Sequence, residues 1–268
     1  MKSLSRIFVW AILAVSIQAA SAQAVTSVYL EDLTWTELRD EIAAGTTTVI
    51  VPIGGTEQSG PAVALGKHNV RARVLAGRIA QGLGHTVVAP VIAYVPEGAV
   101  HPPTAHMRFP GTITIPDAAF ETTLEFAARS LREHGFRDIV FIGDHGGYQK
   151  NMKRVADKLD REWAATPVRV HALDEYYRAA DVEFARLLKS KGLSDAEIGT
   201  HAGVADTSLT LAIDPALVRT SRLRGAKPGR ADGVYGDPAR SSGEFGQLGV
   251  EQIVSQSIEA IRRALARR

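Results

Sequence analysis

Short runs of β-branched residues alternate along this chain with longer segments whose apolar residues recur at helical spacing. In chain order, expected strands and helices take turns over the segments 47–53, 70–83, 86–92, 120–134, 138–142, 152–163, 168–172 and 250–268. Elements in this order form a parallel sheet that helices cover on both faces. We therefore predict an α/β fold: one domain, built as a three-layer αβα sandwich with a mostly parallel sheet.

The first residues have the pattern of a secretory signal peptide. Lys2 and Arg6 come before or at the start of an apolar stretch at 7–17, and Ala20-Ser21-Ala22 offers a cleavage site. The stretch is too short to span a bilayer comfortably. We predict a cleaved leader over residues 1–22 and a periplasmic or secreted domain over 23–268, without membrane attachment after cleavage. An uncleaved anchor or a buried N-terminal helix is the alternative.

Charge and composition narrow the classes of partner and site. The formal net charge is only +2, and the lysines and arginines are dispersed rather than clustered, so we expect no nucleic-acid partner. The chain contains no cysteine. A transition-metal site would therefore have to use histidine, aspartate and glutamate side chains.

Three polar clusters lie beside glycines, which allow close approach of the backbone to a ligand. The first, at 54–69, follows the first expected strand, and the second, at 143–147, follows the third. Ligands of parallel sheets bind at the carboxyl ends of the strands. The third cluster, at 200–208, adds further polar groups. The segment at 93–116 is too long for an ordinary connection, so we expect it to have a function or to contact another subunit.

Four motifs resemble, in order and spacing, those of the creatininase family, which comprises creatinine amidohydrolase and related amide and formamide hydrolases. The motifs are Glu57-Gln58-Ser59-Gly60-Pro61, Phe109-Pro110-Gly111-Thr112, Asp144-His145-Gly146-Gly147 and His201-Ala202-Gly203-Val204-Ala205-Asp206-Thr207-Ser208. The resemblance implies the layered αβα fold, a divalent metal centre and hydrolysis of a cyclic or linear C–N bond in a small-molecule amide. It also implies a homo-oligomer, commonly of six subunits.

The resemblance also implies roles for individual residues. Glu57 matches the first metal-binding glutamate of the family, and His145 matches its metal-binding histidine. Asp206 takes the place of a glutamate in the last motif. His201 matches the histidine that assists proton transfer, and His106 matches a histidine just upstream of the Phe-Pro-Gly-Thr motif.

Two positions depart from the family pattern. Ser59 stands in place of a metal-binding histidine, and His68 in place of the aspartate that bridges two ions. We expect a rebuilt centre for one ion, with Glu57, His68 and His145 as ligands and Asp206 as fourth ligand or base. Zinc is the expected ion, with manganese or iron as alternatives. There are two alternative hypotheses: a centre that still holds two ions, and a metal-free binding protein that has kept the fold.

The expected reaction uses a metal-activated water that attacks the amide carbonyl. Asp206 would accept the proton of this water, and His201 would donate a proton to the leaving nitrogen. Less specific roles remain open for two residues, since Asp206 can also cap a helix and Asp144 can be an ordinary turn residue. Ser59 lacks the flanking glycines of a serine-hydrolase elbow, so we do not expect it to be a nucleophile.

Overall fold

The sheet of this protein is entirely parallel, as its pairing in a computed structural model shows. The structure describes residues 27–223 and 228–267, so the predicted leader over 1–22 lies outside the described residues. Within them the sheet has four strands in the order β2-β1-β3-β4. Their bounds are Thr48–Ile53 for β1, Thr86–Val88 for β2, Asp138–Gly143 for β3 and Arg169–Ala172 for β4.

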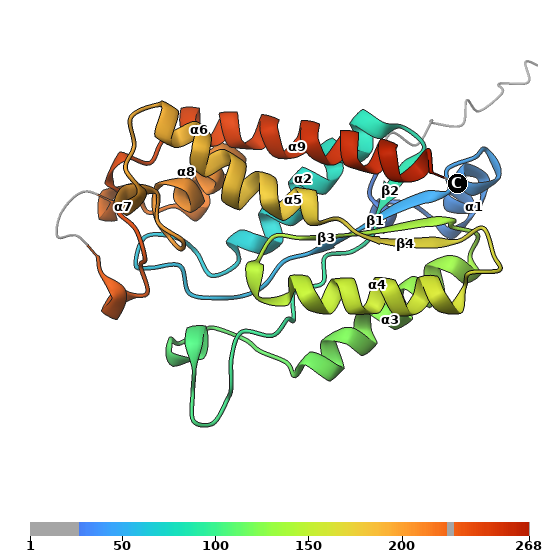
Figure 1. Cartoon of the computed structure of the whole chain (residues 1–268), viewed down its shortest axis with the longest axis horizontal. Helices are drawn as coiled ribbons and strands as arrows, with labels where there is room; N and C mark the ends of the chain where they lie inside the picture. Colours follow the sequence, from blue (N-terminus) through green and yellow to red (C-terminus); the bar gives the residue numbers. More distant parts are fainter. Residues whose placement is uncertain (1–26, 224–227, 268) are drawn as a thin grey trace, which may run out of the picture.

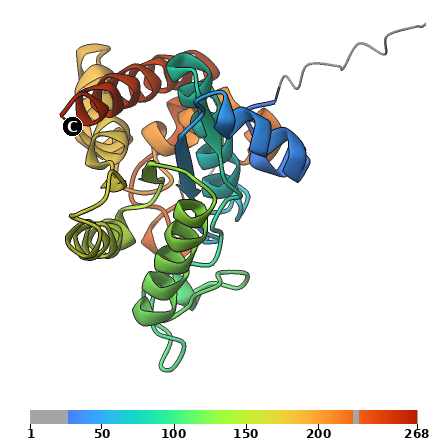
Figure 2. The ribbon, with the colours of Figure 1, turned by 90° about the vertical axis from the view of Figure 1, so that its right-hand side faces the viewer.

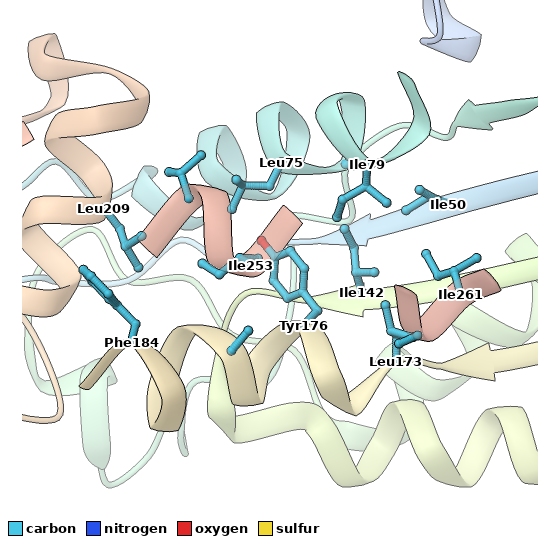
Figure 3. Packing of buried hydrophobic residues seen from close by; sticks show 14 of the residues in the cluster. Ile50, Leu75, Ile79, Ile142, Leu173, Tyr176, Phe184, Leu209, Ile253 and Ile261 are labelled. Atoms are coloured by element: carbon cyan, nitrogen blue, oxygen red, sulfur yellow. The ribbon is translucent and has the colours of Figure 1, made fainter. Parts of the chain in front are cut away.

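Both faces of the sheet are buried, which explains the continuous apolar runs of its central strands. Successive side chains of a strand point to opposite faces. Ile50 and Val140 accordingly pack into one apolar cluster, whereas Val49 and Phe141 pack into the other. Figure 3 shows the first of these clusters between β1, β3 and the helices that cover them. Two separate cores, one on each side of the sheet, give the domain its three layers.

Helices form the two outer layers. On one face α2 and α9 lie with the shorter helices α5, α6 and α8, and on the other face lie α3 and α4 (Figures 1 and 2). The predicted three-layer α/β fold is therefore confirmed. The bounds are Trp35–Ala43 for α1, Lys67–Leu83 for α2, Asp117–Glu133 for α3, Gln149–Glu162 for α4, Asp174–Arg178 for α5, Phe184–Ser190 for α6, Asp195–Ile198 for α7, Val204–Ile213 for α8 and Gly243–Leu265 for α9.

The structure differs from the expected elements in two respects. Strand β2 ends at Val88. After one more hydrogen bond, from the N–H of Ala89 to the carbonyl of Ile50, the chain leaves the sheet and returns to it where Ile92 pairs with Ile53. Helices α5 to α7 were not predicted, and α8 was anticipated only as a helix that Asp206 could cap, without a periodic pattern to support it. Helix α8 shows why: it buries Thr207 and Ser208 beside its apolar residues, so its sequence lacks an amphipathic period. Among the described residues, no helix is long and apolar enough to cross a membrane.

The long segment between β2 and α3 extends beyond the three layers (Figure 1) and is tied back to the end of β1. The backbone N–H of Ile113 donates to the carbonyl of Thr56 at 3.0 Å, and that of Ile115 donates to the carbonyl of Val95 at 3.2 Å. The N–H of Glu97 donates to Thr114 Oγ1 at 2.9 Å. These bonds hold the two limbs of the segment together beside the carboxyl end of the sheet.

Candidate metal centre and active site

The carboxyl ends of β1 and β3 bring the first two polar clusters together, as the sequence predicted. Glu57 follows β1, and His145 follows β3. Tyr148, just after His145, bridges to the end of β1: its buried hydroxyl contacts the carbonyls of Ile53 at 2.8 Å and Gly54 at 2.6 Å. Tyr148 also receives the backbone N–H of His145 on its hydroxyl oxygen, at 3.1 Å. The two motifs are therefore tied together through the side chain of Tyr148.

Four side chains form a group that could hold a metal ion. Glu57, Glu97, His106 and His145 each offer one ligand atom, and these atoms all lie within 4.8 Å of one another. Glu57 Oε2 lies 3.1 Å from His106 Nε2 and 3.3 Å from His145 Nε2. Glu97 Oε2 lies 3.8 Å from His145 Nε2. Glu97 and His106 come from the long segment, which is thereby part of the candidate site.

The oxygens of this group lack the partners that buried carboxylates normally have. Glu57 Oε2 and both carboxylate oxygens of Glu97 are buried without a hydrogen bond, which is costly for a charged group. Burial first, and the neighbouring charge of Glu57 second, raise the pKa of Glu97 to about 9. A divalent cation would satisfy these oxygens, and two imidazoles with two carboxylates are suitable ligands for zinc, manganese or iron. The donor set therefore fits such an ion.

His68 lies between two carboxylates. Its Nε2 is 2.8 Å from Glu57 Oε1, and its Nδ1 is 2.6 Å from Asp144 Oδ2. Burial lowers the pKa of His68, but the two carboxylates more than offset this effect, so the pKa is raised overall. Both ring nitrogens thus face carboxylates, which favours the protonated ring over the neutral ring that could bind an ion. In this arrangement His68 orients Glu57 from behind, as outer residues of metal sites do.

Asp206 lies in a network of buried charges. One of its oxygens, Oδ2, accepts hydrogen bonds from Lys67 and from the backbone N–H of Ala202, and Oδ1 accepts one from Arg71. Burial raises the pKa of Asp206, but Lys67 and Arg71 outweigh it and hold the pKa well below its usual range. The N-cap of α8 is Gly203, so Asp206 does not cap that helix.

The four-residue group shares Glu57 and His145 with the ligand set expected from the sequence. It contains Glu97 and His106 in place of His68 and Asp206. Which residues bind an ion stays a prediction. The buried Oγ of Ser59 has no hydrogen-bond partner, and Ser59 is not a member of the four-residue group.

His201 lies beside the group and contacts Gln58. Its Nε2 is 2.9 Å from the carbonyl oxygen of Gln58, and its Nδ1 is 3.6 Å from Glu57 Oε1. Burial, and then the positive charge of Lys67, lower the pKa of His201 to about 4. The imidazole is therefore neutral near pH 7.

A cavity of about 380 Å³ opens onto this site. It is lined by charged side chains, by imidazoles and by aromatic rings, among them Lys67, Asp206, His106, His145, His201 and Tyr235. A cavity of this size suits a small molecule or one residue of a peptide. Residues of the second polar cluster, at 143–147, and of the third, at 200–208, therefore lie side by side in the wall of this cavity.

Sequence reasoning missed several residues of the site. Glu97 has no motif around it, and the one signal was its place in the long segment expected to be functional. Lys67 lay within the first polar cluster but was given no role, Arg71 was read only as part of a helix, and Asp144 was read as a turn residue. In the structure Arg71 Nη2 lies 2.9 Å from Asp144 Oδ2, and Tyr176 donates to Asp144 Oδ1 at 2.8 Å.

Comparison with known proteins matches the family model "Creatininase: Creatinine amidohydrolase" to residues 31–261. Creatinine amidohydrolase of Pseudomonas putida is 27% identical over 257 residues, which are 88% of this chain and 96% of that protein. Mycofactocin precursor peptide peptidase of Mycolicibacterium smegmatis is 30% identical over 237 residues, which are 80% of this chain and 84% of that protein.

Solved structures agree with this match. A structure described as "Creatininase Mn" has a TM-score of 0.73 and 27% identity, and the match covers 89% of this chain and 98% of that one. A mutant creatininase described as "Zn-Zn type" has a TM-score of 0.72 and 27% identity, with 90% and 99% covered. The family model spans most of the chain, and the sequence motifs, the fold and the solved structures agree with it. The chain therefore belongs to the creatininase family.

Proposed function

We propose that this protein is a metal-dependent hydrolase of a C–N amide bond in a small molecule. The observation that carries the proposal is the pair of buried carboxylates, Glu57 and Glu97, whose unpartnered oxygens face two imidazoles. Relatives named as a creatinine amidohydrolase and a peptide peptidase both act on C–N bonds by their names. Membership of the family and a donor set suited to a cation support the same chemistry.

We assign the ion to Glu57, Glu97, His106 and His145. One ion is favoured over two, because His68 and Lys67 occupy the other oxygen of Glu57 and, within the described part of the chain, leave no second set of free ligands around it. Zinc and manganese are the metals named for the similar solved structures. A divalent ion there would supply a water of lowered pKa and polarise the amide carbonyl.

The chain's own residues would move the proton. In hydrolysis the water oxygen bonds to the carbonyl carbon, the C–N bond breaks, and one proton of the water goes to the leaving nitrogen. We assign this transfer to His201, because its imidazole is neutral near pH 7 and its Nδ1 lies 3.6 Å from Glu57 Oε1, beside the candidate ligands. Its pKa of about 4 makes it a weak base that readily gives the proton on to the leaving nitrogen. Asp206 is a poor base because Lys67 and Arg71 hold it in its charged, hydrogen-bonded form.

Export and self-association are further parts of the proposal. The leader pattern at 1–22 supports a periplasmic or secreted protein. Exposed Tyr94 and Val100 on the long segment, and Phe126 on α3, offer apolar surface for contact with other copies of the chain. A homo-oligomer, expected from the family resemblance, would bury this surface.

The test is metal content per chain together with turnover of a panel of linear and cyclic amides, on protein purified without a histidine tag. We expect one ion per chain and hydrolysis of at least one amide. His145→Ala should lose the ion and the activity, whereas His134→Ala, which replaces an exposed histidine at the end of α3, should keep both.

Two results would contradict the proposal. One is a protein that takes up no ion after zinc or manganese is added back. The other is full turnover by Glu57→Gln. Binding of an amide without turnover, by protein that holds its ion, would favour the catalytically silent binding protein instead.

A further inference from the structure

We propose that Lys67 is a catalytic residue whose ammonium group donates hydrogen bonds to the carbonyl oxygen of the substrate as that oxygen gains negative charge. The inference rests on the proposed amide hydrolysis and adds a residue to its machinery. No covalent step or proton transfer is assigned to Lys67. Its role is to stabilise the developing charge in place, which is the kind of interaction that lowers a reaction barrier most.

The position of Lys67 is unusual for a lysine. It is the first residue of α2, its side chain is 1% exposed, and it nevertheless lines the cavity of the site. Lysines are rarely fully buried unless they are paired. Here the ammonium contacts Asp206 Oδ2 and lies 3.5 Å from Glu57 Oε1. A buried charge that faces the cavity is available to a ligand there.

The ammonium has donors to spare. It carries three N–H groups, and within residues 27–223 and 228–267 the hydrogen bond of Lys67 Nζ goes to Asp206. The contact with Glu57 is an ion pair at longer distance. A carbonyl oxygen that enters the cavity can therefore accept a hydrogen bond from Lys67 without displacing Asp206.

Arg71, one helical turn further on in α2, also lines the cavity, but its terminal nitrogens are taken up within the fold. Its guanidinium donates to the carboxylate and the backbone carbonyl of Asp206 and pairs with Asp144 at 2.9 Å. Two aspartates thus occupy its terminal nitrogens, and its charge is used within the fold. Lys67 differs because its Nζ makes one hydrogen bond, to Asp206, and one longer ion pair, to Glu57, which leaves donor capacity toward the cavity.

Glu57 places Lys67 next to the candidate metal centre. One oxygen of this carboxylate, Oε2, faces His106 and His145, and the other, Oε1, faces Lys67. A substrate carbonyl that approaches the centre therefore meets the ammonium on the other side of Glu57. Asp206 acts as a positioning residue, since the N–H of Ala202 at 3.0 Å fixes the oxygen that holds Lys67.

The experiment compares metal-loaded parent protein with Lys67→Met and Lys67→Gln. The control is Lys189→Met, because Lys189 also pairs with an aspartate, Asp195, but on the surface. Three quantities are measured: metal content per chain, kcat on the amide that the panel identifies, and the affinities for acetate and acetamide by calorimetry. Acetate carries the anionic oxygens of an acid product, and acetamide is its neutral counterpart.

We expect Lys67→Met to keep its metal and to lose about 10²- to 10³-fold in kcat, the usual effect of removing one donor to a developing oxyanion. Its affinity for acetate should fall at least about tenfold, as expected for a lost hydrogen bond to a charged group, while acetamide binding changes less. Lys189→Met should match the parent. If Lys67→Met does not fold, Lys67→Gln, which keeps a neutral donor, serves for the same comparison.

Several outcomes would overturn the proposal. A metal-loaded Lys67 variant with parental kcat or parental acetate affinity would do so, and so would a parent that binds no acetate. Loss of the metal from both variants would instead assign Lys67 to the assembly of the metal centre. If no amide is hydrolysed, the proposed function fails, whereas the acetate comparison still decides whether Lys67 binds an oxyanion.

Discussion

The adjacent carboxylates of Glu57 and Glu97 should make the stability of the metal-free protein depend on pH. In that state the pKa of Glu97 is raised to about 9, because burial and then Glu57 disfavour its charged form. The pKa of a glutamate in an unfolded chain is about 4.3. Between these two values the folded protein holds a proton that the unfolded chain has released, so stability falls as the pH rises.

The size of the effect follows from the same linkage. Each pH unit in this window costs about 1.4 kcal/mol per proton, so the chelator-treated protein should lose about 3 kcal/mol between pH 6 and pH 8 from Glu97 alone. Glu97→Gln does not titrate and should lack this loss. Without metal at pH 8, the variant should therefore be more stable than the parent, although it has lost a charged side chain.

Urea unfolding at pH 6, 7 and 8, with chelator and then with zinc, measures these differences. Histidines titrate in the same range, so the difference between parent and Glu97→Gln is the quantity to compare. With zinc the order should reverse, because a ligand at a thousandfold excess over its Kd stabilises by about 4 kcal/mol and the variant binds it less tightly. Glu259→Gln, a surface change on α9, is the control. Equal pH slopes for parent and Glu97→Gln in chelator would refute the reasoning.

Three further results are expected. Asp206→Asn should destabilise the protein by about 3 kcal/mol at pH 7 in urea unfolding, because Lys67 loses its buried partner. Since the pKa of Asp206 is lowered, this contribution to stability is present above about pH 4 and is lost as the pH falls below that value. Equal stability of parent and variant at pH 7 would contradict the prediction. Gly199→Ala should lower the melting temperature more than Gly192→Ala, because both have positive φ but only the first Cβ would overlap a backbone carbonyl. His201→Ala should lower kcat with metal content unchanged, and because the pKa of His201 is about 4, the parent profile should show no loss from this group between pH 5.5 and pH 8.

The fold was predictable because its signals are local. Each strand of the sheet is a short apolar run whose alternate residues, such as Ile50 and Val51, fill opposite cores. Helices α2, α3, α4 and α9 show their period in the sequence. Helix α8 does not, since it buries hydroxyl groups beside apolar residues, and its structure depends on contact with α9.

The candidate site was predictable only in part, since many of its contacts join distant residues. Motif spacing located Glu57 and His145, because both follow strands of one parallel sheet. Glu97 lies in a segment without periodicity, and its placement depends on hydrogen bonds such as that to Thr114. The bond between Lys67 and Asp206 joins residues 139 positions apart, so neither residue type nor local pattern could reveal it. The two carboxylates around His68 are likewise set by the fold alone.

The long segment at 93–116 supplies two of the four candidate ligands, and the ends of β1 and β3 supply the others. An ion bound to all four would act as a cross-link between three stretches of chain that are far apart in sequence. Cross-links stabilise mainly by restricting the unfolded chain, and they do so most when the loops they close are long. In a chain without cysteine, the metal would then do the work of a disulfide. Its removal should expose the segment to proteases before the sheet itself unfolds.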